Sequence, residues 1–251
     1  RKSNLIVLYD LISLALELKT NNGSEKMSGK YLLLAILIAL TASFSEAQNL
    51  TLGVKGGGSL VKMNFEGPVP EYRTNHGFSF GASVAYEFNE LISLESDLLY
   101  VQKGTKYAQE YASLPGYQPT VYKYTYTLKY ISIPFLAKLY LPVESDLQPH
   151  LTLGPSFNFL LGGKMEYTVD RDPYLNYPFI VIPSYFDITS KTKSFDLGVI
   201  AGLGVDYHLV SSVTSLEIRY EMGMTNIDKG IGSGPIKNRS FSILLGYQFQ
   251  F

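Results

Sequence analysis

Side chains that could do acid–base or metal chemistry are few in this sequence. Its three histidines, His76, His150 and His208, lie in separate segments, and it has no cysteine. Without cysteine, disulfides, thiolate metal sites, cysteine nucleophiles and a lipid anchor on cysteine are excluded. A zinc site needs several ligands close together, which scattered histidines do not supply. We therefore expect neither a metal nor another cofactor.

Hydrolytic chemistry also has weak support. The Gly-x-Ser-x-Gly turn that presents a serine nucleophile does not occur. His76 falls between two predicted strands and could act with a carboxylate on a membrane lipid. A single loop histidine is more commonly just solvated. We predict no catalytic residue and no enzyme, with a lipid-modifying enzyme as the alternative.

A larger set of charged side chains shares one face of the predicted strands, where each alternates with apolar neighbours. These residues are Lys55, Glu87, Glu95, Asp97, Lys103, Lys138, Asp196, Asp206, Glu217, Arg219 and Glu221. Acids and bases in similar number favour a structural ion-pair network, because buried charges are tolerated when they are paired. A proton relay or a permeation path is the functional alternative.

The elements that carry these charges are read from the alternation of apolar and polar residues, because successive strand side chains point to opposite faces. The pattern predicts eight strands, an even number that suits a closed antiparallel barrel. They cover about 50–65, 78–88, 92–103, 121–141, 151–161, 195–207, 216–224 and 239–251.

Connections between these strands alternate in length. Residues 89–90, about 142–148 and 209–213 are short turns, whereas about 66–76, 105–120, 165–192 and 226–238 are longer. Short turns on one rim and long loops on the other are typical of outer-membrane barrels.

Alternation alone does not say which face points inward, and a soluble barrel of the lipocalin type would show the same period. The polar faces are mostly Gly, Ser, Ala and Thr, and the apolar faces run for five to seven positions without a charge. A mid-bilayer Lys or Arg would cost about 2 to 4 kcal/mol, so these runs suit lipid. We predict an all-β, eight-stranded transmembrane barrel whose lumen is filled by side chains, with a narrow solute channel as the alternative.

One strand breaks the pattern. Its apolar parity changes from Tyr126 and Leu128 to Ile131 and Ile133. A slip of one residue turns every side chain over, so we predict a bulge near Lys129 or Tyr130, or a first half that lies beyond the membrane.

The final strand ends on alternate aromatic residues, Tyr247, Phe249 and Phe251. This ending resembles the signal by which outer-membrane barrels are handed to the barrel assembly machinery, which we expect as a partner together with outer-membrane lipid.

Residues 27–47 have the three regions of a secretory signal peptide: Lys30, an apolar run, and Ser45-Glu46-Ala47 as the cleavage site. We expect residues 1–26 to be upstream extension and 48–251 to be the mature barrel in the outer membrane. A net charge of -1 argues against nucleic acid as a partner.

Four segments carry a family resemblance: KYISIPFLAKLYL (129–141), QPHLTLGPSFNFLLGG (148–163), SFDLGVIAGLGVDY (194–207) and RYEMGMTNID (219–228). They resemble the PorT-like, porin-family outer-membrane β-barrel proteins of Bacteroidota. The resemblance implies an outer-membrane location and a role like that of accessory factors in type 9 protein secretion. It carries no catalytic motif.

We therefore expect a non-enzymatic scaffold, surface-contact protein or secretion accessory, with other envelope proteins as further partners. Tyrosine is a contact residue of low entropic cost, and several tyrosines fall in two long predicted loops. The expected loop contacts are Tyr111, Tyr117, Tyr174, Tyr177 and Tyr185. An equal alternative is that these rings extend the aromatic girdle of the membrane surface.

Overall fold

A computed structural model describes residues 49–65, 72–111, 120–143, 145–170, 184–231 and 234–250. The predicted signal peptide, the extension before it and Phe251 lie outside these residues. Among the residues described, no helix is both long and apolar enough to cross a membrane.

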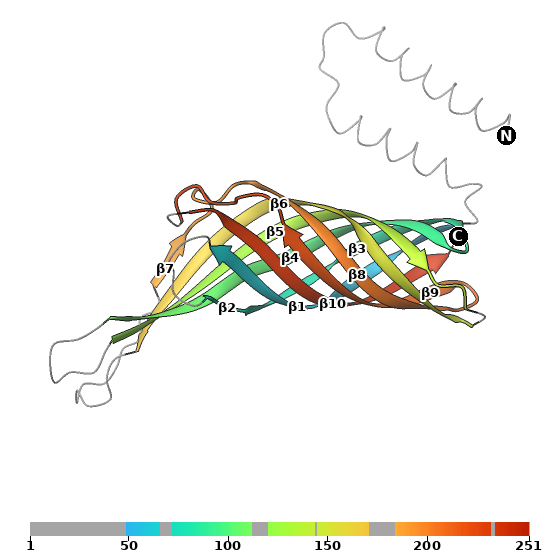
Figure 1. The fold of residues 1–251 in the computed structure, drawn as a ribbon, viewed down its shortest axis with the longest axis horizontal. Helices are drawn as coiled ribbons and strands as arrows, with labels where there is room; N and C mark the ends of the chain where they lie inside the picture. Colours follow the sequence, from blue (N-terminus) through green and yellow to red (C-terminus); the bar gives the residue numbers. More distant parts are fainter. Residues whose placement is uncertain are drawn as a thin grey trace, which may run out of the picture. The chain divides into compact units, whose positions relative to one another are not determined.

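Ten strands form one sheet (Figure 1). Two are short: β2 (Tyr72–Arg73) and β7 (Ser184–Asp187). The eight long strands are β1 (Leu50–Phe65), β3 (Asn75–Asn89), β4 (Ile92–Tyr111), β5 (Thr120–Tyr140), β6 (Leu147–Asp170), β8 (Phe195–His208), β9 (Ser212–Gly223) and β10 (Ile236–Gln250).

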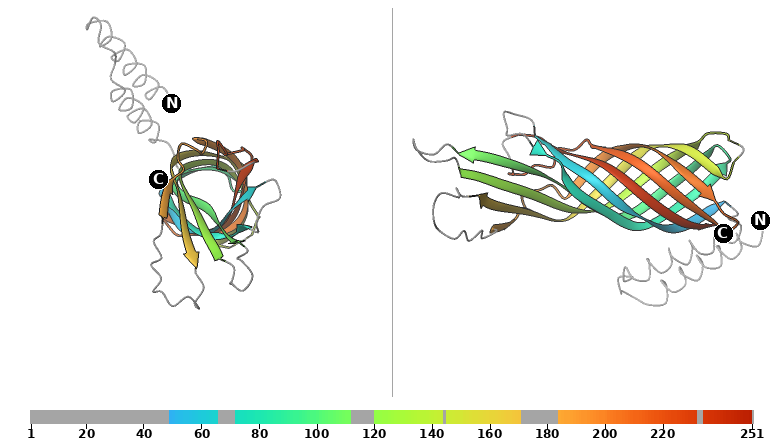
Figure 2. Two further views of the ribbon diagram at one scale, coloured as in Figure 1. Left: turned by 90° about the vertical axis from the view of Figure 1, so that its left-hand side faces the viewer. Right: turned by 90° about the horizontal axis from the view of Figure 1, so that it is seen from below.

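The long strands close into the predicted eight-stranded barrel. Their order around the ring is β1, β10, β9, β8, β6, β5, β4 and β3, and β3 returns to β1. Figure 2 shows the ring end-on and from below. Pairing of β1 with β10 joins the first and last strands in antiparallel register from Thr51↔Gln250 to Phe65↔Ile236, which closes the ring of described strands.

Apolar side chains of the eight strands point outward, as the alternation predicts. Leu153, Val199 and Ile243 are 58%, 39% and 50% exposed, while polar residues of the opposite parity on the same strands, Thr152, Asp196 and Ser240, are buried. An outer surface of Leu, Ile, Val and Phe over a polar interior is the reverse of a soluble barrel and suits a lipid solvent.

The strands are longer than the sequence pattern predicts at the long-loop end. β4 continues to Tyr111 and pairs there with Thr120 of β5, so half of the expected loop at 105–120 is strand. β6 runs to Asp170 and pairs with β5, and its residues Lys164–Tyr167 pair with β7. These paired segments of β4, β5, β6 and β7, which we call the strand extension, project beyond the ring in Figure 1.

A register shift lies at Lys129/Tyr130, where the sequence predicts a bulge. The extra residue is on the partner strand: Lys129 faces Gly162 and Tyr130 faces Leu160, which leaves Leu161 of β6 unpaired. β5 itself keeps one orientation throughout. Its inward residues are therefore apolar near the long-loop end, and Tyr126, Leu128 and Tyr130 are buried inside the barrel.

These inward side chains belong to an apolar cluster inside the long-loop end of the barrel. Its buried members are Met63, Tyr126, Leu128, Tyr130, Ile188, Ile227 and Ile236. Ile188 and Ile227 come from the connections that follow β7 and β9, so these connections fold over the barrel mouth. We call this group the apolar plug.

Candidate functional site

The charged interior of the barrel is the candidate functional site. Every charged residue predicted to share the polar face occupies an inward position, and all of them are buried except Glu87, which is half-buried near the short-turn end. Alternation places these side chains on the inner face, and closure of the ring brings opposite strands within reach of one another. They form two layers.

In the first layer, Arg219 of β9 meets three carboxylates. Its Nη1 lies 2.6 Å from Asp97 Oδ2, and its Nη2 lies 2.5 Å from both Glu95 Oε1 and Glu217 Oε2. Because β4 and β9 stand on opposite sides of the ring, these bonds cross the lumen. A planar guanidinium can bridge several carboxylates at fixed angles, which suits this position better than a lysine would.

Two lysines complete the same layer. Lys55 Nζ lies 2.5 Å from Glu95 Oε1 and 3.0 Å from Glu217 Oε1. Lys138 Nζ lies 3.0 Å from Glu95 Oε2, 3.0 Å from Glu217 Oε1 and 3.2 Å from Asp206 Oδ2. Each carboxylate of this layer (Glu95, Asp97, Asp206 and Glu217) therefore has a cationic partner, which offsets the cost of removing these charges from water.

A second layer lies between the first and the apolar plug. Lys103 Nζ is 2.8 Å from Glu221 Oε2, and Ser156 Oγ and Asn158 Nδ2 donate to Glu221 Oε1 at 2.6 and 2.9 Å. Asn238 Nδ2 donates to Asp196 Oδ2 (2.8 Å) and to the Tyr130 hydroxyl (3.3 Å). Tyr130 thus links this layer to the plug.

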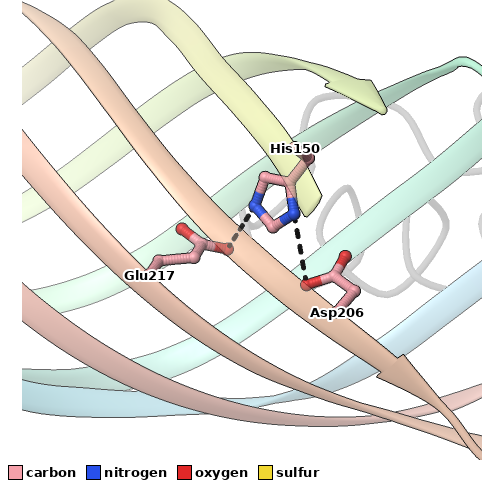
Figure 3. A group of neighbouring side chains, drawn as sticks. All are labelled: His150, Asp206 and Glu217. Atoms are coloured by element: carbon pink, nitrogen blue, oxygen red, sulfur yellow. Dashed lines mark ion pairs between the residues drawn. The ribbon is translucent and has the colours of Figure 1, made fainter. Parts of the chain in front are cut away.

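His150, Asp206 and Glu217 form the one group of described residues whose donor atoms are close enough to hold a metal ion (Figure 3). His150 Nδ1 is 3.6 Å from Asp206 Oδ1, and His150 Nε2 is 3.8 Å from Glu217 Oε1. Glycine at position 204 makes room for the ring, because a Cβ there would lie 2.7 Å from His150 Nε2.

The residues around this group do not suit a metal ion. Glu217 Oε1 already lies 3.0 Å from the ammonium nitrogens of both Lys55 and Lys138, and Lys138 also contacts Asp206. A cation bound here would face two ammonium groups at short range. We therefore interpret the group as part of the ion-pair layer.

Sequence reasoning missed several members of these layers. His150, which the sequence did not point to as a site residue, is buried in the lumen, where it packs edge-on against Tyr140 at 5.4 Å. The available signal was the parity that His150 shares with the inward residues Thr152 and Ser156. Ser156, Asn158 and Asn238 were not predicted as site residues, because alternation assigns a residue to a face and does not identify its hydrogen-bond partner.

Other predicted positions lie apart from the interior. His76 faces outward on β3, and its backbone N–H donates to Asn75 Oδ1 at 2.9 Å. The expected loop residues Tyr111 and Tyr185 are instead on strands β4 and β7, and Lys164 Nζ lies 3.8 Å from the centre of the exposed Tyr185 ring. Tyr117, Tyr174 and Tyr177 are outside the described residues. Tyr247 and Phe249 point outward at the end of β10.

Comparisons with solved structures find barrels of low sequence identity. Ail, the attachment invasion locus protein of Yersinia pestis, is 15% identical, with 80% of this chain and 99% of that chain covered and a TM-score of 0.39. Neisserial surface protein A is 19% identical (80% and 97% covered, TM-score 0.40). OprG from Pseudomonas aeruginosa is 14% identical (81% and 96% covered, TM-score 0.37).

No curated protein sequence matches the chain. One protein family matches the chain: the outer membrane protein beta-barrel domain family, over residues 45–229. This match covers most of the sequence, and it agrees with the closed ring and its apolar outer surface. The chain therefore belongs to the outer membrane protein beta-barrel domain family and is an integral protein of the bacterial outer membrane.

Proposed function

We propose that this protein is a non-enzymatic barrel that acts by contact at the cell surface, as a scaffold or as a PorT-like accessory component of protein secretion. The observation that carries the proposal is the filled interior. Two layers of ion pairs and the apolar plug occupy successive levels of the lumen. A barrel filled in this way has little room for a solute path or for a substrate, which leaves its outer end as the working surface.

The strand extension supports contact as the activity. Its tyrosines stack across neighbouring strands, with Tyr107 and Tyr124 at 4.6 Å between ring centres and 12° between planes, and Tyr167 and Phe186 at 5.9 Å and 15°. Stacked rings on paired strands lose little entropy when a partner binds, because they are already ordered. The extension is thus an ordered surface that a partner could bind.

A lipid-modifying activity is less well supported. His76, the one histidine at the long-loop end that was considered for it, points outward from β3, whereas the buried carboxylates point inward. A general base needs an orienting carboxylate on its own side of the wall.

Replacement of residues 171–183 by a short Gly-Ser linker tests the surface-contact proposal while β7 and the plug residue Ile188 stay in place. Proteins cross-linked to the wild type and to the variant in native outer membranes would be compared by mass spectrometry. We expect envelope partners to be lost from the variant and kept in a Val210→Ala control, which alters a turn on the opposite rim. The same partners in both variants would contradict a contact role for this end.

Delivery to the membrane is a separate part of the proposal. Tyr247 and Phe249 lie on the outward face of β10, edge to face at 5.1 Å, where the barrel assembly machinery could bind them before the barrel closes. A Phe249→Ser variant should reach the outer membrane in reduced amount, whereas a Gln248→Asn variant on the inner face should not.

A further inference from the structure

Basic side chains gather on the outside of the barrel at its long-loop end. On β1, β5, β6 and β10, the outward apolar run is followed at this end by a Lys or Arg: Lys62 after Leu60, Lys129 after Ile131, Lys164 after Leu161, and Arg239 after Phe241. β4 and β2 add Lys106 and Arg73, both exposed. We call these six residues, Lys62, Arg73, Lys106, Lys129, Lys164 and Arg239, the basic collar.

The opposite rim has different charges. The described residues of its three turns, 90–91, 141–143 with 145–146, and 209–211, include the exposed acids Glu90 and Asp146 and contain neither Lys nor Arg. With a net charge of -1 for the chain, the collar is a local concentration and not the result of a basic composition. The long-loop rim faces the cell exterior in outer-membrane barrels, so the collar lies at the outer leaflet.

Strand pairing places like charges of the collar directly opposite each other. Lys62 of β1 is the register partner of Arg239 of β10, and Arg73 of β2 is the partner of Lys106 of β4. Like charges at such positions destabilise a sheet unless an anion lies between them. Two pairs of this kind on one rim therefore point to an anionic ligand.

The height of the collar identifies that ligand. Lys129 faces Gln102 of β4, Lys106 faces Thr125 of β5 two outward positions further along, and Lys164 faces Thr127 between them. The Lys164 side chain is half exposed, although Glu166 Oε2 lies 3.7 Å from its Nζ. These three collar lysines thus lie within two outward positions of one another on neighbouring strands, beyond the outward apolar runs and at the level where we place the lipid headgroups.

We propose that the basic collar binds the phosphate groups of phosphorylated glycolipids in the outer leaflet. Each phosphate offers several acceptor oxygens to a Lys or Arg pair, and bound lipid would relieve the repulsion within Lys62–Arg239 and Arg73–Lys106. The collar would also hold the barrel at a fixed depth, with the strand extension outside the membrane.

The test uses refolded mature protein in phosphatidylcholine nanodiscs that contain bisphosphorylated lipid A, with dephosphorylated lipid A in parallel discs. Lipid A retained per barrel after detergent extraction is counted by mass spectrometry. The test variant is Lys106→Gln/Lys129→Gln/Lys164→Gln. The matched control carries Arg at the same three positions, and a second control, Lys191→Gln/Lys229→Gln, removes exposed lysines from connecting segments.

Each collar charge should contribute about fivefold to retention, since a basic side chain near an anionic membrane surface contributes about 1 kcal/mol. We expect the triple Gln variant to lose retention by about a hundredfold, and the Arg variant and the loop variant to stay near wild type. Wild-type retention should fall with rising salt and with dephosphorylated lipid. Equal retention of both lipids, or by the triple Gln variant, would overturn the proposal. Displacement of lipid A by millimolar inorganic phosphate would assign the collar to free phosphate instead.

Discussion

Arg219 and Asp97 meet across the barrel, with Arg219 Nη1 2.6 Å from Asp97 Oδ2. They are 122 positions apart in the sequence and lie on β9 and β4, which stand four places apart in a ring of eight strands. One hydrogen bond therefore spans the lumen. The same guanidinium also contacts Glu95 and Glu217, so Arg219 connects strands on opposite sides of the barrel.

Removal of the Arg219 charge should destabilise the barrel strongly. An Arg219→Leu variant leaves Asp97 with Lys55 at 3.7 Å as its remaining ion pair, and a buried charge that loses its partner costs about 3 to 5 kcal/mol. Urea unfolding in detergent, followed by far-UV circular dichroism, gives the free energy of unfolding. A Lys229→Gln control in an exposed segment should stay within about 0.5 kcal/mol of wild type. A gain in stability for Arg219→Leu would mean that desolvation outweighs the pairing.

Gly204→Ala should disturb the group around His150. The added Cβ would lie 2.7 Å from His150 Nε2 and 2.8 Å from Glu217 Cγ, and such overpacking costs about 1 to 3 kcal/mol. Gly58→Ala is the matched control, because a Cβ there meets nothing within 4 Å. The control should be neutral or slightly stabilising in the same unfolding experiment. Equal effects at the two glycines would contradict the placement of His150.

Leu128→Ala should open a cavity in the apolar plug. Leu128 is fully buried, so the truncation should cost about 2 to 5 kcal/mol, whereas Leu139→Ala on the outward face of the same strand should cost less. Thermal midpoints measured by the gel shift between folded and heated barrel would compare the two. A larger loss of stability for Leu139→Ala than for Leu128→Ala would contradict the inward orientation of Leu128.

A cation on the lipid face should be poorly tolerated. Ile243 is 50% exposed in the middle of the outward face of β10, and an Arg near the bilayer midplane costs about 2 to 4 kcal/mol. Val210→Arg is the control, since Val210 lies in a turn beyond the strands and is fully exposed. Folding yields into vesicles should fall for Ile243→Arg alone. Comparable yields for both would argue that Ile243 faces water.

Much of this fold could be predicted from the sequence because a strand in lipid has a simple rule. Ile243, Val199 and Leu153 belong to the mostly apolar parity of their strands, and each points outward as alternation requires. The charged positions follow from the same rule, since Glu95 and Arg219 fall on the opposite parity. These inferences need only the two-residue period of a strand.

The partners of those charges could not be predicted. Alternation places Lys138 and Glu217 inside, but their contact depends on the ring order and on the stagger between strands. The apolar plug was missed for a related reason: Tyr126 and Leu128 looked like a flipped lipid face, whereas they point inward under the connections that carry Ile188 and Ile227. The bulge was placed at the correct height but on the wrong strand, because Leu160 and Leu161 are equally apolar.

Single-channel recording of the refolded mature chain in a planar bilayer tests the filled interior most directly. At neutral pH and high salt, the ion-pair layers and the plug predict no stable unitary current, and Leu128→Ala should stay silent because the ionic layers remain. Reproducible stepwise conductance from the wild-type barrel would contradict a closed lumen and would support the alternative of a narrow solute channel.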